Sequence, residues 1–194
     1  MITQRLSTYT VPDLTVLMTL KGHTHWILCS LFLHDDRVVT GSYDQTIRVW
    51  DAEGNAIHII EEHSNVVCSL AVSPDGKVLV SGGDDNKLCI YDSDTYEITA
   101  SVSCEGYVWS LCFIDNSIVL AGVHESEMIA VDVQTGKVIK KYDGEYTWPS
   151  IAIRTKPERP SVVSLSDVST YMTSHLHTSA FSAAHHHMIS IACC

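Results

Sequence analysis

The sequence contains no run of about 18 consecutive apolar residues, the length that a membrane-spanning helix requires. Its first five residues are not followed by an apolar run either, so we expect neither a membrane span nor a secretory signal. The seven cysteines include no CxxC pair, although four lie in apolar segments that read as strands: Cys29, Cys68, Cys89 and Cys112. This pattern predicts buried, reduced thiols in a cytoplasmic or nuclear protein rather than a disulfide framework.

Positive charge is scarce along most of the chain. There are 12 Lys and Arg residues against 23 Asp and Glu residues, and the formal net charge is −11. Residues 1–150 hold 21 of the acidic and 9 of the basic residues. So acidic a segment lacks the basic surface that contacts phosphate backbones, which argues against nucleic-acid binding and favours a basic partner. Hydrophobic residues make up 45% of the sequence, which excludes disorder of the whole chain.

One block of sequence returns at a spacing of 40 or 41 residues. Its first copy begins at Gly22-His23 and ends at Trp50-Asp51, and its second has His63, Asp85 and Tyr91-Asp92 at the matching positions. A third, weaker copy ends at Val131-Asp132. A period of this length predicts one supersecondary unit repeated in tandem.

Each copy contains four short apolar segments separated by Asp, Asn, Gly and Pro, the pattern of strands joined by hairpins. The predicted strands are 27–33, 37–42, 46–51 and 56–60 in the first copy, 66–72, 77–81, 87–92 and 97–102 in the second, and 108–113, 118–121, 128–133 and 137–142 in the third. We therefore expect an all-β chain over residues 5–154, with antiparallel units in tandem and no helix longer than two turns.

The ends of the array are predicted to hold partial units. Residues 1–21 resemble the last two strands of a preceding unit, complete units span 22–61, 62–103 and 104–143, and residues 144–155 begin a fourth. Beyond this point Pro157 and Pro160 interrupt any strand, and Ser and His residues then dominate. The sequence thus predicts a non-repeat, disordered tail over 156–194.

The Gly-His…Trp-Asp pattern at this spacing resembles the WD40 repeat. The resemblance implies a β-propeller with blades of four antiparallel strands, here an incomplete ring of about three blades and two partial ones. Hairpins such as 33–44 look most like those of F-box and RING-type WD40 proteins, which use the propeller to hold substrates for ubiquitin ligation.

The resemblance also implies one hydrogen-bonded network in each blade. It joins the His of Gly-His, a hydroxyl of the second strand, the Asp of the next turn and the Trp of the third strand. The first copy supplies the full set: His23, Thr40 or Ser42, Asp44 and Trp50. The second has His63, Ser81, Asp85 and, in place of Trp, Tyr91; the third has Cys104, Glu125 and Val131, so its network is expected to be largely absent.

Aromatic residues recur three positions after the His of the repeat or its replacement. These positions hold Trp26, Val66 and Tyr107, and the resemblance places them at the rim where partners of propellers dock, beside Tyr43, Asp84 and His124. We expect Trp26, Tyr43, Asp84, Tyr107 and His124 to contact a partner, because exposed aromatics often dominate binding energy. The alternative is that Trp26 and Tyr107 only cover the ends of strands.

The function expected is a non-catalytic scaffold that binds a protein or peptide, with substrate recruitment for ubiquitin ligation suggested by family analogy alone. The Asp-His-Ser trio could also be a catalytic triad, but it occurs in two copies and a nucleophile needs only one. We expect no cofactor and no metal site.

Two alternatives remain from the sequence. The first is a truncated product without independent function, because an open ring leaves blade faces in water unless another chain supplies the missing blades. The second is a metal-dependent enzyme that uses the tail, although the spacing fits no zinc motif. The possible ligands are His175, His177, His185, His186, His187, Cys193 and Cys194.

Overall fold

The structure is a computed structural model that describes residues 5–9, 16–124, 126–146, 151–154 and 161–164. These residues form β-strands and turns, so the all-β prediction is confirmed. No helix in this part of the chain is long and apolar enough to cross a membrane. The four cysteines predicted to lie in strands are all buried there.

Three sheets of four antiparallel strands follow one another along the chain, and each is a blade with its strands in sequence order. The first blade consists of β3 (Ile27–Phe32), β4 (Val38–Ser42), β5 (Ile47–Trp50) and β6 (Ala56–Ile60). The second consists of β7 (Val67–Val72), β8 (Val78–Gly83), β9 (Lys87–Asp92) and β10 (Ile98–Ser103). The third consists of β11 (Val108–Phe113), β12 (Ile118–Val123), β13 (Ser126–Asp132) and β14 (Lys137–Tyr146).

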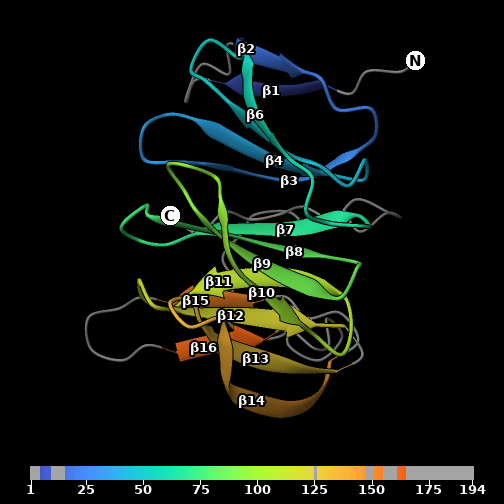
Figure 1. The fold of residues 1–194 in the computed structure, drawn as a ribbon, viewed down its shortest axis with the longest axis vertical. Helices are drawn as coiled ribbons and strands as arrows, with labels where there is room; N and C mark the ends of the chain where they lie inside the picture. The colour runs from blue at the N-terminus through green and yellow to red at the C-terminus, as the bar shows by residue number, and fades with distance from the viewer. Residues whose placement is uncertain (1–4, 10–15, 125, 147–150, 155–160, 165–194) are drawn as a thin grey trace, which may run out of the picture.

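A two-stranded hairpin lies at each end of this series. Strands β1 (Arg5–Tyr9) and β2 (Val16–Lys21) pair with each other before the first blade. After the third blade, β15 (Ile151–Arg154) pairs with β16 (Ser161–Ser164). Figure 1 shows β1 and β2 at the top of the molecule and β15 beside the third blade.

Two elements extend beyond the predicted strands. The strand expected to end at residue 142 continues to Tyr146, and β16 lies within the segment 156–194, which remains predicted as a non-repeat tail. The prolines at 157 and 160 precede β16 in the sequence, so they do not interrupt it, and Val162 and Val163 favour a strand. The remainder of the predicted tail, 156–160 and 165–194, lies outside the described residues.

The blades face one another through their first strands. Strands β3, β7, β11 and β15 lie side by side in that order, which produces the stack of sheets in Figure 1. Close approach depends on small residues in the second strands: a Cβ on Gly41 would meet Val67 Cγ1 at 2.7 Å, and one on Gly82 would meet the Val108 carbonyl oxygen at 2.9 Å. The apolar side chains between the sheets form continuous cores across the blade boundaries.

Candidate partner-binding face and buried polar networks

In the first blade, four side chains form one continuous chain of hydrogen bonds. The Trp50 indole Nε1–H donates to the Thr40 hydroxyl at 2.9 Å, and Thr40 Oγ1 lies 2.7 Å from His23 Nε2. The other ring nitrogen, His23 Nδ1, lies 2.8 Å from a carboxylate oxygen of Asp44. Because His23 and Thr40 have no exposed surface and Trp50 is 1% exposed, these polar atoms depend on each other for partners.

Local backbone geometry places these groups together. Thr40 and Trp50 lie on neighbouring strands, and Asp44 lies in the turn between them, where Gln45 adopts a φ of 72°. Asp44 also accepts hydrogen bonds from the backbone amides of Thr24 and Thr46. Ser42, the alternative to Thr40 in the sequence, donates instead to the Trp26 carbonyl oxygen at 2.9 Å.

The hydrogen-bond pattern fixes the tautomer of His23. The Asp44 carboxylate can only accept, so His23 Nδ1 carries the hydrogen and donates it, and in the neutral ring Nε2 accepts from the Thr40 hydroxyl, which also accepts from Trp50. Burial lowers the pKa of His23 from its ordinary value, although the hydrogen bond and charge of Asp44 oppose that effect. The ring is therefore neutral at neutral pH.

The second blade repeats the arrangement with different donors. His63 Nδ1 lies 2.9 Å from Asp85 Oδ1, and His63 Nε2 lies 2.7 Å from Ser81 Oγ. The Tyr91 hydroxyl, 3.2 Å from Ser81 Oγ, takes the place of the indole N–H. Burial lowers the pKa of His63, but hydrogen bonds with the Cys89 thiol and with Asp85 outweigh this effect and raise it.

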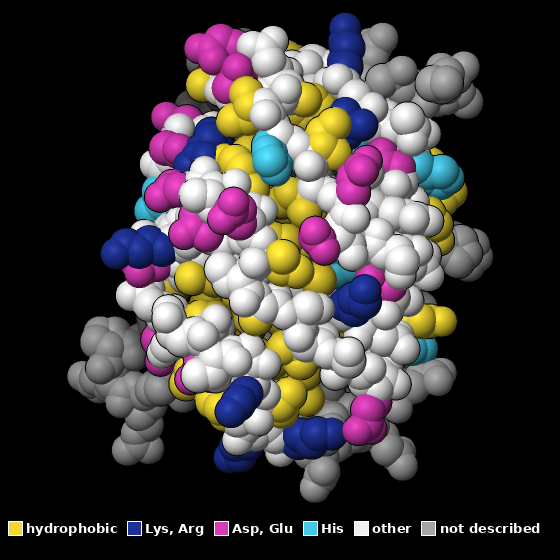
Figure 2. Space-filling view, in the orientation of Figure 1, with side chains coloured by type: hydrophobic (Ala, Val, Ile, Leu, Met, Phe, Trp, Pro, Cys, Tyr) yellow, Lys and Arg dark blue, Asp and Glu magenta, His cyan; other side chains and the backbone are white. Residues whose placement is uncertain are grey.

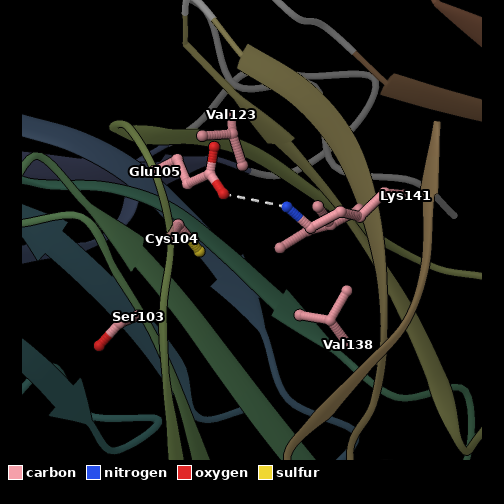
Figure 3. A pocket seen from close by; sticks show the side chains of 7 residues that line it. Ser103, Cys104, Glu105, Val123, Val138 and Lys141 are labelled. Carbon is pink, nitrogen blue, oxygen red and sulfur yellow. Dashed lines mark hydrogen bonds and ion pairs between the residues drawn. The ribbon is translucent and has the colours of Figure 1, made fainter. Parts of the chain in front are cut away.

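The third blade has apolar side chains at the corresponding positions. Ala121 and Val131 are fully buried where the first blade has Thr40 and Trp50, and Glu125 lies outside the described residues. Cys104 takes the place of His23 and lines a cavity of about 50 Å³. Figure 3 shows this cavity and the ion pair across it, in which Lys141 Nζ lies 3.1 Å from Glu105 Oε1; the seven lining residues are Ser103, Cys104, Glu105, Val123, Ile129, Val138 and Lys141.

Acid should weaken the first blade through Asp44. Burial raises the pKa of this carboxyl, but hydrogen bonds from Thr46, Thr24 and His23 outweigh it and lower the pKa to about 2. An unfolded carboxyl titrates near 3.9, so the stabilisation is complete above that pH and is lost as the pH falls toward 2. Urea denaturation at pH 4, 3 and 2 should show a steeper loss of stability for the wild type than for Asp44→Asn; parallel losses would contradict this assignment.

The residues predicted to contact a partner lie at two equivalent positions of the repeat, one before the first strand and one after the second strand of each blade. At the start of each first strand, a backbone carbonyl accepts from the amide of a residue just after the second strand, at 2.8–2.9 Å. The three pairs are Trp26 with Tyr43, Val66 with Asp84, and Tyr107 with His124. Val66 is buried, so we call the surface formed by the other five residues the rim face.

Aromatic rings of the first blade form an exposed cluster on the rim face. Trp26 and Tyr43 are 60% and 43% exposed, and their ring centres lie 5.8 Å apart at a steep angle. His25 stacks on Tyr43 with ring centres 4.9 Å apart. These edge and stacking contacts hold the large rings in place while leaving much of their surface in water.

A second aromatic cluster joins the second and third blades. Tyr107, Trp109 and His124 lie with their ring centres 4.2–6.2 Å apart. The Trp109 indole donates to Asp84 Oδ1 of the second blade at 2.7 Å, and the Cys68 thiol donates to the same oxygen at 3.0 Å. This carboxylate is thus held by one residue of its own blade and one of the next.

His25, Cys68 and Trp109 are the members of these clusters that the sequence reading missed. Trp109 corresponds to Leu28 and Cys68 in the other repeats, so the repeat pattern does not mark this position as aromatic. A Trp among smaller equivalents was the available signal, because an indole N–H shielded from water needs an acceptor.

An open hollow lies beside the second cluster, and acidic side chains are unevenly distributed over the molecule. Beside Tyr107 and His124 lies an open hollow of about 450 Å³, also lined by Asn86, Glu105 and Gly106. In Figure 2, acidic side chains gather over the upper part of the face shown, whereas basic ones are more scattered. No group of three or more His, Cys, Asp and Glu side chains in the described residues could hold a metal ion, and the His-rich tail lies outside them.

Comparisons with known proteins agree with this architecture. The family described as "WD domain, G-beta repeat" matches residues 14–51 and 54–92. WD repeat-containing protein 25 of Mus musculus is 34% identical over 143 residues, which are 69% of this chain and 26% of that protein. The guanine nucleotide-binding protein subunit beta of Lymnaea stagnalis is 35% identical over 147 residues, 72% of this chain and 43% of the relative.

A third relative, small ribosomal subunit protein RACK1y of Oryza sativa subsp. japonica, is 28% identical over 124 residues, 62% of this chain and 37% of its own length. The chain thus spans less than half of each of these three relatives.

Proposed function

We propose that this chain, whose residues 14–51 and 54–92 match the WD domain, G-beta repeat family, is a non-catalytic scaffold that binds a protein or peptide through the rim face. The observation that carries the proposal is the pair of aromatic clusters, one on the first blade and one between the second and third. Trp26 and Tyr107 are 60% and 42% exposed although neighbouring rings contact each of them. Large apolar rings held rigidly at the surface bind a partner with little loss of side-chain entropy.

The partner is expected to be basic. Residues 1–150 hold 21 acidic and 9 basic residues, and Asp84 lies on the rim face beside the second aromatic cluster. Glu105, which pairs with Lys141, lines the hollow beside Tyr107. A Lys or Arg side chain in this hollow would lie near a carboxylate and an aromatic ring, and both attract cations. An extended peptide could contact the clusters of successive blades at once.

The proposed absence of catalysis is supported by the burial of the His–Asp–hydroxyl sets. The hydroxyls of Thr40 and Ser81 belong to residues with no exposed surface, so a substrate could not reach them. Two of the relatives are named as a ribosomal subunit protein and as a subunit of a guanine nucleotide-binding protein, names that describe parts of larger assemblies. Recruitment for ubiquitin ligation and the truncated-product alternative both remain predictions.

The proposal predicts that displayed peptides selected on this chain will be rich in Lys and Arg. Trp26→Ala and Tyr107→Ala should each weaken the affinity of a selected peptide about tenfold, since anchor residues contribute about 1–3 kcal/mol. Affinity should also fall as salt is raised from about 50 to 300 mM, because salt screens the attraction between charges. Fluorescence polarisation with a labelled peptide measures both effects.

Phe32→Ala is the matched control. Phe32 is 57% exposed and lies at the opposite end of the strand that begins beside Trp26, so it is an equally accessible aromatic away from the rim face. If Phe32→Ala weakens binding as much as Trp26→Ala, or if the selected peptides carry no excess of basic residues, the rim face is not the binding site.

A further inference from the structure

Asp84 carries the only carboxylate among the five residues of the rim face. The equivalent positions of the first and third blades hold the aromatic rings of Tyr43 and His124. Asp84 is half-buried, so part of this residue stays open to a ligand. Which cation a partner can place here depends on how the two carboxylate oxygens are already used.

Hydrogen bonds fix both the backbone and the side chain of Asp84. Its amide donates to the Val66 carbonyl oxygen at 2.9 Å, and its carbonyl oxygen accepts from the Asn65 side-chain amide at 3.4 Å. Its carboxylate oxygen Oδ1 accepts from the Cys68 thiol at 3.0 Å and from the Trp109 indole N–H at 2.7 Å. These two donors lie on β7 and β11, which are side by side in Figure 1, so two blades orient one carboxylate.

Both donors to Oδ1 remain donors at neutral pH. An indole N–H can only donate, and Trp109 is held by ring contacts with His124 and Tyr107. Burial raises the pKa of the Cys68 thiol, and the hydrogen bond and charge of Asp84 raise it further, so the thiol stays protonated. The other acceptor near this thiol, the Val66 carbonyl oxygen, is more distant at 3.8 Å. Oδ1 therefore accepts two hydrogen bonds in the folded chain.

The two oxygens of the Asp84 carboxylate are consequently not equivalent. A carboxylate oxygen has about two lone-pair positions, so the two donors occupy those of Oδ1. Among the residues that the structure describes, both side-chain hydrogen bonds of this carboxylate go to Oδ1 and none goes to Oδ2. The carboxylate keeps its negative charge but offers a ligand one oxygen rather than two.

A single available oxygen favours lysine over arginine. The guanidinium of arginine commonly donates two parallel N–H groups to the two oxygens of one carboxylate, and this geometry requires both oxygens. The ammonium of lysine is a compact charge with three rotatable donors, so one oxygen is sufficient for it. With Oδ1 occupied, arginine loses its second hydrogen bond at Asp84, whereas lysine loses none.

We propose that Asp84 binds a lysine side chain of the partner, and that Cys68 and Trp109 are positioning residues that prevent bidentate binding of arginine. This inference rests on the proposed function, because it specifies the ligand of the rim face. Trp109 also contacts Tyr107, whose ring is 42% exposed, so the methylene groups of the lysine have an apolar surface beside the carboxylate.

Peptides selected by display on the wild-type chain are the probe for this preference. Each lysine of a selected peptide is changed to arginine, one at a time, and the affinity is measured by fluorescence polarisation. At one position the change should weaken binding about fivefold, the effect of losing roughly one net hydrogen bond. Asp84→Asn, which keeps an acceptor oxygen for Trp109 but has no charge, should abolish that difference. Equal affinities of the two forms at every position, or an unchanged preference in Asp84→Asn, overturns the proposal.

Variants of the two donors test the positioning. Trp109→Phe keeps an aromatic ring without the N–H, and Cys68→Ala removes the thiol. Each change frees a lone pair of Oδ1 for arginine, so the preference for lysine should fall below about twofold. Cys68→Ser keeps a donor and should keep the preference. A loss of affinity that is equal for the lysine and arginine forms, with their ratio unchanged, would show that these residues only support the fold.

Urea denaturation establishes that each variant is folded before its affinities are compared. If Trp109→Phe does not fold, the pair Cys68→Ala and Cys68→Ser decides the question. Two outcomes separate the role of Asp84 from the proposed function. If basic peptides bind and Trp26→Ala weakens them, but lysine and arginine forms bind equally, only the role of Asp84 is wrong. If no basic peptide is selected, the proposed function is wrong and the role of Asp84 is wrong with it.

Discussion

Replacing Asp44 with alanine should lower the free energy of unfolding by about 3 kcal/mol at pH 7. The Asp44 carboxylate accepts hydrogen bonds from His23 Nδ1 at 2.8 Å, the Thr24 amide at 2.9 Å, and the amide and hydroxyl of Thr46 at 3.1 and 2.6 Å. Without it, the buried His23 N–H loses its acceptor, and each buried unpaired polar group costs about 1–3 kcal/mol. Urea denaturation followed by tryptophan fluorescence measures the change.

Asp115→Ala is the control for this prediction. The Asp115 carboxylate also accepts several hydrogen bonds in a turn, from the amide and hydroxyl of Ser117 and the amide of Ile118, but it is exposed. Water can replace the lost acceptor there, so the cost should stay below about 1 kcal/mol. Equal shifts for the two variants would remove the case for an energetically important network in the first blade.

Gly82→Val should destabilise the chain by about 3 kcal/mol or more. Gly82 lies on β8 where the second blade meets the third, and a Cβ there would lie 2.8 Å from Val108 Cβ and 2.9 Å from the Val108 carbonyl oxygen. The Val108 carbonyl cannot move without disturbing β11, so β8 and β11 must move apart. The measurement is the urea midpoint, with Gly82→Ala as the milder variant if Gly82→Val does not fold.

A double-mutant cycle tests the cause. Val108→Ala removes Val108 Cγ1, the atom nearest the new Cβ, so it should restore part of the stability lost in Gly82→Val. Ser103→Val places the same β-branched side chain at an exposed strand position and should change stability by less than about 0.5 kcal/mol. Strictly additive effects of Gly82→Val and Val108→Ala would show that the contact between blades is not responsible.

Most of the strands could be predicted because each is defined by its own few residues. Alternating apolar residues and Asp- or Gly-rich turns located the strands of the first two blades to within about two residues. Strand β16 was missed for a specific reason: Pro157 and Pro160 were taken to end the array, whereas Ser161–Ser164 form a strand after them. A proline excludes its own position from a central strand and leaves a later segment unaffected.

The candidate site was harder to predict from the sequence because it depends on contacts between blades. The repeat pattern pointed to His23, Asp44 and Trp50, but the choice between Thr40 and Ser42 required the register at the end of β4. The hydrogen bond from Trp109 to Asp84 could not be anticipated, since the two residues belong to different blades and to different repeat positions. The period of the sequence defines the fold of one unit, but it does not define which side chains of neighbouring units come into contact.

Because the third blade has apolar side chains where the first blade has a polar network, the two blades should lose stability under different conditions. The first blade is held partly by a carboxylate and an imidazole, and protons weaken that pair. The third blade has Cys104, Ala121 and Val131 in those positions and relies on burial of hydrocarbon, which contributes less stability on cooling. A chilled sample at neutral pH should therefore loosen first at the third blade, whereas a warm acidified sample should loosen first at the first.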